Sequence, residues 1–175
     1  MSIEKLFAKI TALFRAVKID YMLVGGLAVA YWGYPRQSLD VDIVIGLNKT
    51  GTDDFIKTAE KQNFSLSPHE IRAMVKLGNR FVMEAEGVRL DCWLPRSEIE
   101  RAALKNRKMK MVFGQKLYII SPEDLIISKL RVGRPRDLED IKTVLLRQGK
   151  KLKKAYLTKQ ANVIGMRDVL RKLGY

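Results

Sequence analysis

The segment 38–45 constrains the fold more than any other part of the chain, because apolar and polar residues alternate along it. One set of alternate positions is apolar and the other carries two acids: Leu39, Val41, Ile43 and Ile45 against Asp40, Asp42 and Val44. A period of two predicts a β-strand with one buried face. Two carboxylates then share the opposite face and repel each other by a few kcal/mol at an effective dielectric of about 20. A positive group is expected between them.

Magnesium suits this position, because it is a hard ion that binds one or two carboxylates together with substrate phosphates. Paired ions about 3.5–4 Å apart would clamp the attacking and leaving oxygens of an in-line displacement at phosphorus. The alternative is a strand edge that faces solvent. An Asp-x-Asp pair does not by itself decide between the two, so its neighbours in the sequence carry the argument.

The first neighbour is a glycine pair that separates an expected strand from an expected helix. A helix over 3–17 leads to an apolar strand at 21–24, then Gly25 and Gly26, then a helix over 27–32. Glycines let the backbone approach a phosphate, and the N–H groups at a helix N-terminus favour its charge. The alternative is an ordinary tight turn.

A third acid is expected on a later strand. Two arms, 80–85 and 88–94, predict a hairpin that turns at Glu86 and Gly87, and Asp91 lies on the non-apolar face of the second arm. The remaining elements give a mixed α/β chain: a helix over 52–62 capped by Thr52 or Asp53, an unpatterned stretch at 63–78, a helix over 97–106, strands at 109–113 and 117–120, and helices over 122–131, from 136 or 137 to 147, and from 151 onward.

The composition limits which residues can bind a metal ion and where in the cell the protein is expected. With only Cys92 and His69, the chain cannot form an intramolecular disulfide or a four-ligand zinc site of cysteine and histidine, so carboxylates must carry most of any metal chemistry. No apolar run approaches the roughly 20 residues of a membrane span. The amino terminus lacks the pattern of a signal peptide. We expect a cytoplasmic protein with no membrane partner, and one compact unit made of a core, 1–120, and a helical segment, 121–175.

Positive charge is concentrated at the carboxyl-terminal end. The formal net charge is +14, and residues 142–175 hold ten Lys and Arg against one acid, Asp168, which gives +9. Such an excess attracts polyanions and favours RNA as a partner. The alternative is a solvated, lysine-rich helix face.

Two stretches together resemble a known motif: Leu23-Val24-Gly25-Gly26 and, a little further on, Arg36-Gln37-Ser38-Leu39-Asp40-Val41-Asp42-Ile43. They are similar to the first motif of the polymerase-beta-like nucleotidyltransferase superfamily, and more narrowly to the AbiEii-like group of small bacterial nucleotidyltransferases. Ser38 stands where threonine is usual and keeps the hydroxyl. Asp91 matches the third acidic position of the superfamily.

A second motif extends the resemblance into the carboxyl-terminal helices. Ser121-Pro122-Glu123-Asp124 begins a helix that carries Lys129, and Gly133-Arg134-Pro135-Arg136-Asp137 follows it. In the family, a lysine at the position of Lys129 is expected near the triphosphate, with Arg134 close by. The alternative is that both cations pair with Asp137, Glu139 or Asp140 on the surface, where an ion pair contributes under about 1 kcal/mol.

The resemblance implies an α+β fold: a mixed, mostly antiparallel sheet flanked by helices, with a helical carboxyl-terminal segment. It also implies transfer of a nucleoside monophosphate from a nucleoside triphosphate, with Mg²⁺ or Mn²⁺, to RNA, a protein or a small molecule. Asp40, Asp42 and Asp91 would bind metal and catalyse, whereas nucleotide binding is assigned to Gly25, Gly26, Arg36, Ser38, Lys129 and Arg134. Some members belong to toxin–antitoxin pairs, so a toxin or antitoxin partner is a further expectation. The alternative is a non-catalytic module that binds RNA or a protein.

Overall fold

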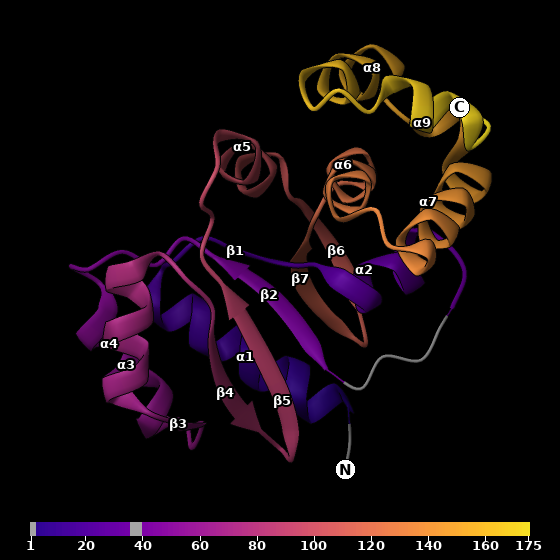
Figure 1. The fold of residues 1–175 in the computed structure, drawn as a ribbon. Coiled ribbons are helices and arrows are strands. Elements are labelled where there is room, and N and C mark those ends of the chain that lie inside the picture. The colour runs from indigo at the N-terminus through magenta and orange to yellow at the C-terminus, as the bar shows by residue number, and fades with distance from the viewer. Residues whose placement is uncertain (1–2, 36–39) are drawn as a thin grey trace.

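The structure is a computed structural model that describes residues 3–35 and 40–175. Its described residues form a mixed sheet of seven strands in the order β3-β4-β5-β2-β1-β7-β6 (Figure 1). The strands are β1 (Tyr21–Leu23), β2 (Val41–Ile45), β3 (Ser65–Leu66), β4 (Phe81–Ala85), β5 (Val88–Trp93), β6 (Lys108–Val112) and β7 (Gln115–Ile119). Strand pairs β1–β7 and β2–β5 are parallel and the other pairs are antiparallel, which confirms the expected sheet.

Helices flank this sheet and continue beyond it at the carboxyl-terminal end (Figure 1). They are α1 (Ile3–Val17), α2 (Gly25–Trp32), α3 (Thr52–Lys61), α4 (Pro68–Leu77), α5 (Glu98–Asn106), α6 (Pro122–Val132), α7 (Pro135–Gln148), the 3-10 turn η1 (Gly149–Lys151), α8 (Lys154–Val163) and α9 (Arg167–Lys172). The buried face of α1 includes Leu6, Phe7, Ile10, Leu13 and Phe14, which confirms the helix expected over 3–17. In the described part of the chain, no helix is both long and apolar enough to cross a membrane.

Strand β2 has the alternation that the sequence predicts. Val41, Ile43 and Ile45 are buried, whereas Asp42 and Val44 are half-buried on the other face. Within the described residues the strand begins at Val41, where its pairing with β5 starts opposite Leu90. Asp40 therefore precedes the strand, and the expected strand residues Ser38 and Leu39 lie outside the described residues.

Helix α4 and strand β3 occupy the stretch for which the sequence analysis expected no element. Ser67 caps α4 by accepting a hydrogen bond from the Glu70 N–H at 3.3 Å, and Pro68 fills the first turn. Gly78 ends the helix in the left-handed region at φ +63°. These are ordinary start and stop signals, so the sequence contained the information needed to predict α4.

The cap expected for the third helix is wrong. Gly51 occupies the N-cap position of α3 and no side chain caps it. Thr52 is buried as the first residue of α3, and its hydroxyl donates to the Asn48 carbonyl at 2.8 Å. The predicted cap fails because Thr52 and Asp53 both lie inside the helix, after the N-cap position.

Two buried acids at the start of α6 fasten the carboxyl-terminal helices to it. Ser121 caps α6 as predicted, and the Tyr156 hydroxyl donates to Asp124 Oδ1 at 2.6 Å. The Lys153 backbone N–H donates to Glu123 Oε1 at 2.7 Å. Because these contacts join α6 to α8, the basic end of the chain is packed onto the remainder of the protein.

Candidate active site

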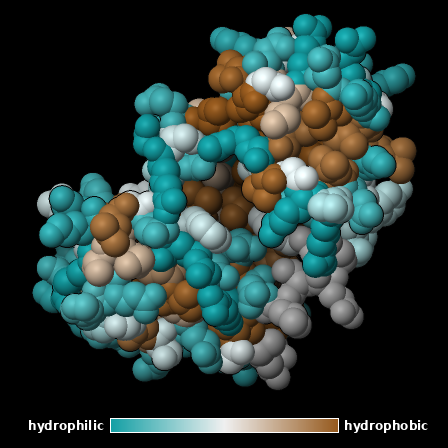
Figure 2. Space-filling view, viewed as in Figure 1, coloured by the Kyte–Doolittle hydropathy of each residue, from teal (hydrophilic) through white to brown (hydrophobic). Residues whose placement is uncertain are grey.

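A cleft of about 370 Å³ opens where strands β1, β2 and β5 meet helices α5, α6 and α7. Gly25, Asp42, Trp93, Lys129 and Arg134 are among the residues that line it. On the face viewed in Figure 2, hydrophobic residues lie in a hollow surrounded by hydrophilic ones. The cleft therefore brings together residues from the glycine turn, the acidic strand and the second motif.

Gly25 and Asp42 are in direct contact at one wall of the cleft. Gly25 begins α2 with φ +62°, and a Cβ at this position would lie 2.1 Å from Asp42 Oδ2. The Val24 N–H donates to the Asp42 carbonyl at 2.9 Å, which ties the turn to β2. Only glycine fits between the carboxylate and this backbone. The predicted strand and helix are confirmed, but the helix begins at Gly25, so the two glycines form its first turn and not a separate turn before it.

Asp42 is held in a half-buried position that disfavours its charge. Burial raises the pKa of Asp42 above its ordinary value, and the nearby carboxylates of Asp91 and Asp40 raise it further. Two interactions act in the opposite direction and lower this pKa: the 3.2 Å hydrogen bond from Trp93 Nε1 to Asp42 Oδ1 and the positive charge of Lys129. A cation placed beside Asp42 would favour its ionised form and oppose this shift.

Asp91 lies directly opposite Asp42 on the neighbouring parallel strand. Its Oδ1 accepts hydrogen bonds from the Arg80 guanidinium and from Arg89 Nη2, the latter at 3.1 Å. The Arg80 guanidinium also stacks on the Trp93 ring, 5.3 Å from its centre. Sequence analysis missed both arginines, although Arg89 is on the same strand face as Asp91 and two residues away.

Lys129 forms a buried ion cluster at the back of the cleft. Its Nζ donates to Asp137 Oδ1 and Asp140 Oδ2, each at 2.7 Å. Arg134 Nε donates to Asp137 Oδ2 at 2.8 Å, and its side chain is 72% exposed. Burial would raise the pKa of Asp137, but the hydrogen bonds from Arg134 and Lys129 bring that pKa below its ordinary value. Both cations therefore form the ion pairs that the sequence analysis gave as the alternative to phosphate binding. The pairs of Lys129 are buried, whereas the alternative placed them on the surface.

The residues fit a metal ion only if the nucleotide supplies ligands as well. No three His, Cys, Asp or Glu side chains among residues 3–35 and 40–175 are grouped so that they could hold a metal ion. Asp42 lines the cleft and the charge of Asp40 acts on it; two carboxylates suffice for magnesium when phosphate oxygens complete its shell. Arg36 and Ser38, assigned to the nucleotide from the sequence, lie outside the described residues.

Three solved structures are similar to this chain in fold. The crystal structure of ANT(2")-Ia in complex with adenylyl-2"-tobramycin matches with a TM-score of 0.59 at 13% identity, covering 96% of this chain and 99% of that one. A lincomycin-bound lincosamide antibiotic adenylyltransferase, LnuA, matches at 0.54 and 20% identity over 82% and 96%. An antigenic nucleotidyltransferase-like protein from Paracoccidioides brasiliensis matches at 0.56 and 18% identity over 98% and 91%. The chain therefore has the nucleotidyltransferase fold.

A match to a protein-family model identifies the family of this chain. Residues 2–166 match the family described as "Nucleotidyltransferase of unknown function (DUF6036)", and the chain belongs to that family. A comparison with curated proteins found no match. The resemblance to the nucleotidyltransferase superfamily is thus confirmed at the level of family and fold.

Proposed function

We propose that this protein transfers a nucleoside monophosphate from a nucleoside triphosphate to an acceptor and releases pyrophosphate. The observation that carries the proposal is the contact between Gly25 and the Asp42 carboxylate. It places the first turn of α2, which no side chain caps, beside the acid that would hold a metal ion. A triphosphate at the start of α2 would therefore reach both the helix N-terminus and the acidic strand.

The phosphates would be held by backbone and by cations. The N–H groups at Gly25 and Gly26 belong to the first turn of α2 and favour a negative ligand. Lys129 has three N–H donors and gives two of them to Asp137 and Asp140, so one is left for a phosphate oxygen. Arg134 is exposed at the same cleft. For Arg36 and Ser38 the proposal rests on the sequence motif alone.

Asp40 and Asp42 would hold magnesium or manganese. When bound there, the ion would neutralise phosphate charge and support an in-line displacement at the α-phosphorus. Asp42 must be ionised for this role, so its raised pKa makes metal binding weaken as pH falls. Trp93 fixes the orientation of the Asp42 carboxylate through its indole N–H.

Asp91 would act through Oδ2, the carboxylate oxygen to which neither arginine donates. All three hydrogen bonds from the two arginines go to Oδ1, so Oδ2 is the atom that would bind a metal ion or take a proton from the acceptor hydroxyl. Arg80 and Arg89 hold this carboxylate in place.

The acceptor class that we propose is RNA, on the strength of the basic carboxyl-terminal end. Membership of the AbiEii-like group, a toxin–antitoxin role and a protein partner remain predictions from sequence resemblance. The rival function is a non-catalytic module that binds RNA or a protein through the same fold. The pairing of Asp91 with two arginines favours this rival, since it gives the third acid a structural role.

Nucleotide binding separates the two functions. A nucleoside triphosphate at about one hundred times its dissociation constant should stabilise the protein by about 2.7 kcal/mol, and the effect should require Mg²⁺ or Mn²⁺. For a chain of this size, that corresponds to a rise in Tm of roughly 5–10 °C. Thermal unfolding with each of the four ribonucleotides, with and without metal, measures it. No rise with any of them would support the non-catalytic module.

A further inference from the structure

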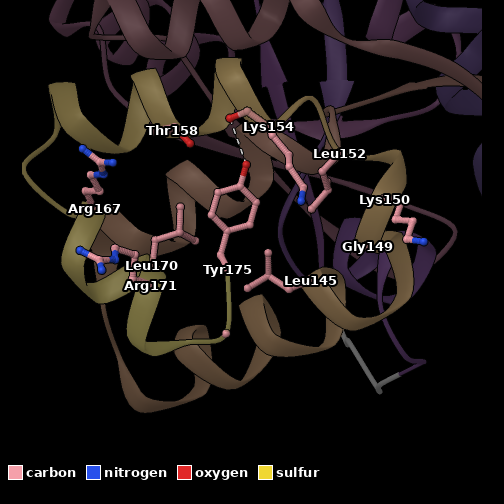
Figure 3. A pocket seen from close by; sticks show the side chains of 11 residues that line it. Leu145, Gly149, Lys150, Leu152, Lys154, Thr158, Arg167, Leu170, Arg171 and Tyr175 are labelled. Atoms are coloured by element: carbon pink, nitrogen blue, oxygen red, sulfur yellow. Dashed lines mark hydrogen bonds between the residues drawn. The ribbon is translucent and has the colours of Figure 1, made fainter.

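A second cavity, of about 510 Å³, lies among the last helices of the chain, between the end of α7, η1, α8 and α9 (Figure 3). It shares no lining residue with the active-site cleft. Its volume lies in the range of pockets that hold small ligands. We call it the carboxyl-terminal pocket; its lining includes Leu145, Lys150, Leu152, Lys154, Arg167, Leu170, Arg171 and Tyr175.

The interior of the carboxyl-terminal pocket is apolar and contains one aromatic ring. Leu152 and Leu170 are buried in it. The ring of Tyr175 lies in the pocket between these walls, and its hydroxyl donates to the Lys154 carbonyl at 3.0 Å (Figure 3). Because the hydrogen bond holds the ring by its edge, the ring has a fixed orientation against which a flat ligand can stack.

The rim of the pocket is positive. Lys150, Lys154, Arg167 and Arg171 are exposed there, and the two arginines lie together on one side (Figure 3). The single acid of the segment, Asp168, is 3.9 Å from Arg171. Lys150, Lys154 and Arg167 have no ion-pair partner within the described part of the chain. Such a rim selects an anion, and the apolar interior selects a ligand that also has a flat apolar part.

We propose that the carboxyl-terminal pocket binds one nucleotide of a single-stranded RNA, with the base stacked on Tyr175 and phosphates at Arg167 and Arg171. Stacking a base on an aromatic ring beside backbone-binding cations is how proteins hold unpaired strands. This inference rests on the proposed function for its choice of RNA, since RNA is the acceptor class proposed there. The pocket would hold the acceptor strand at a second site, outside the cleft.

Two observations favour a polymer over a free mononucleotide. Residues 142–175 carry +9, which is more charge than one phosphate group needs. Several of the cations, such as Lys151, Lys159 and Lys172, lie outside the pocket lining and are exposed. A longer strand has further phosphates for such cations, whereas a mononucleotide would meet only the rim.

The test is the binding of a fluorescent single-stranded RNA of about 12 nucleotides to the full-length protein, without nucleotide or metal, measured by anisotropy over a range of salt. The variants are Arg167→Gln, Arg171→Gln and Tyr175→Leu. Arg72→Gln, on α4 at the opposite side of the molecule (Figure 1), removes the same charge and serves as the matched control. A duplex RNA of the same sequence tests the requirement for an unpaired base.

The arginine, tyrosine and control variants should have different effects. Arg167→Gln and Arg171→Gln should each flatten the log-log salt slope by about 0.7. Tyr175→Leu should keep the slope and weaken binding about fivefold or more at every salt concentration. Arg72→Gln should change neither quantity. Equal affinity for the duplex, or equal effects of Arg72→Gln and Arg167→Gln, would overturn the inference.

The result is independent of catalysis, because neither nucleotide nor metal is present. If RNA binding fails while the cleft still binds a nucleoside triphosphate with metal, the carboxyl-terminal pocket is refuted and the proposed transfer reaction stands. If RNA binds as expected while no nucleotide binds the cleft, the pocket stands and the transfer reaction is refuted.

Discussion

The Gly25 backbone lies so close to the Asp42 carboxylate that a single methyl group at position 25 would stand 2.1 Å from Oδ2. Gly25→Ala should therefore displace Asp42 from the cleft and abolish metal-dependent nucleotide binding. The positive φ at this position adds strain of about 1–2 kcal/mol. Calorimetric titration with triphosphate and Mg²⁺, together with urea unfolding, would measure both effects.

Gly87→Ala is the matched control for this variant. Gly87 has φ +74° in the turn between β4 and β5, and a Cβ there meets no atom within 4 Å. Its substitution should cost a similar strain energy and leave nucleotide binding unchanged. If both alanine variants lost binding equally, strain and not the contact with Asp42 would explain the loss.

Asp42→Asn should raise the stability of the metal-free protein at neutral pH. The pKa of Asp42 is raised in the folded state, so the folded protein retains this proton at a pH where the unfolded chain has lost it. Stability is therefore lost as pH rises from the ordinary aspartate pKa of about 3.9 through the folded pKa. Asparagine removes that loss and can still accept from Trp93. Tm measured from pH 4 to pH 8 in chelator should show the advantage of the variant growing with pH.

The same variant should lose the stabilisation that Mg²⁺ and a triphosphate give the native protein. We expect Asp42→Asn to have a higher Tm than the native protein without metal, and to show no further rise when metal and nucleotide are added. This pattern is expected when a carboxylate that binds ligand destabilises the free protein. A lower Tm for Asp42→Asn at pH 7 in chelator would contradict the electrostatic account of this site.

Lys129→Met should be severely destabilising, whereas Arg134→Gln should not. Removing the buried lysine leaves Asp137 and Asp140 without their shared cation, at a cost of about 3 kcal/mol or more. Arg134 is exposed, so its pair with Asp137 contributes under about 1 kcal/mol. Urea unfolding would measure both costs. Equal costs for the two variants would show that the Lys129 cluster behaves as a surface pair.

Local sequence patterns predicted the parts of the site that depend on a strand or helix alone. The alternation along 38–45 placed Asp42 on the face away from the apolar residues, and Ser121 correctly marked the start of α6. The hairpin was predicted with its turn at Glu86 and Gly87. In each case, the determining interactions join residues close together in the chain, so a single sequence contains them.

The relations between distant segments could not be predicted in this way. Asp91 faces Asp42 because β5 pairs in parallel with β2, a register set by burial across the whole sheet. The capture of Asp91 by Arg80 and Arg89 follows from that register. The burial of Lys129 depends in turn on how α7 packs against α6, which the spacing of charges does not reveal.

The most direct test of the account is to ask whether Asp42 supports nucleotidyl transfer. The protein would be incubated with α-³²P-labelled triphosphates, Mg²⁺ and either total RNA or total protein, and the label in each fraction would be counted for the native chain and for Asp42→Asn. The account predicts label in RNA, with pyrophosphate released, and its loss in Asp42→Asn. Label in neither fraction, or equal label from the variant, would contradict the proposed active site.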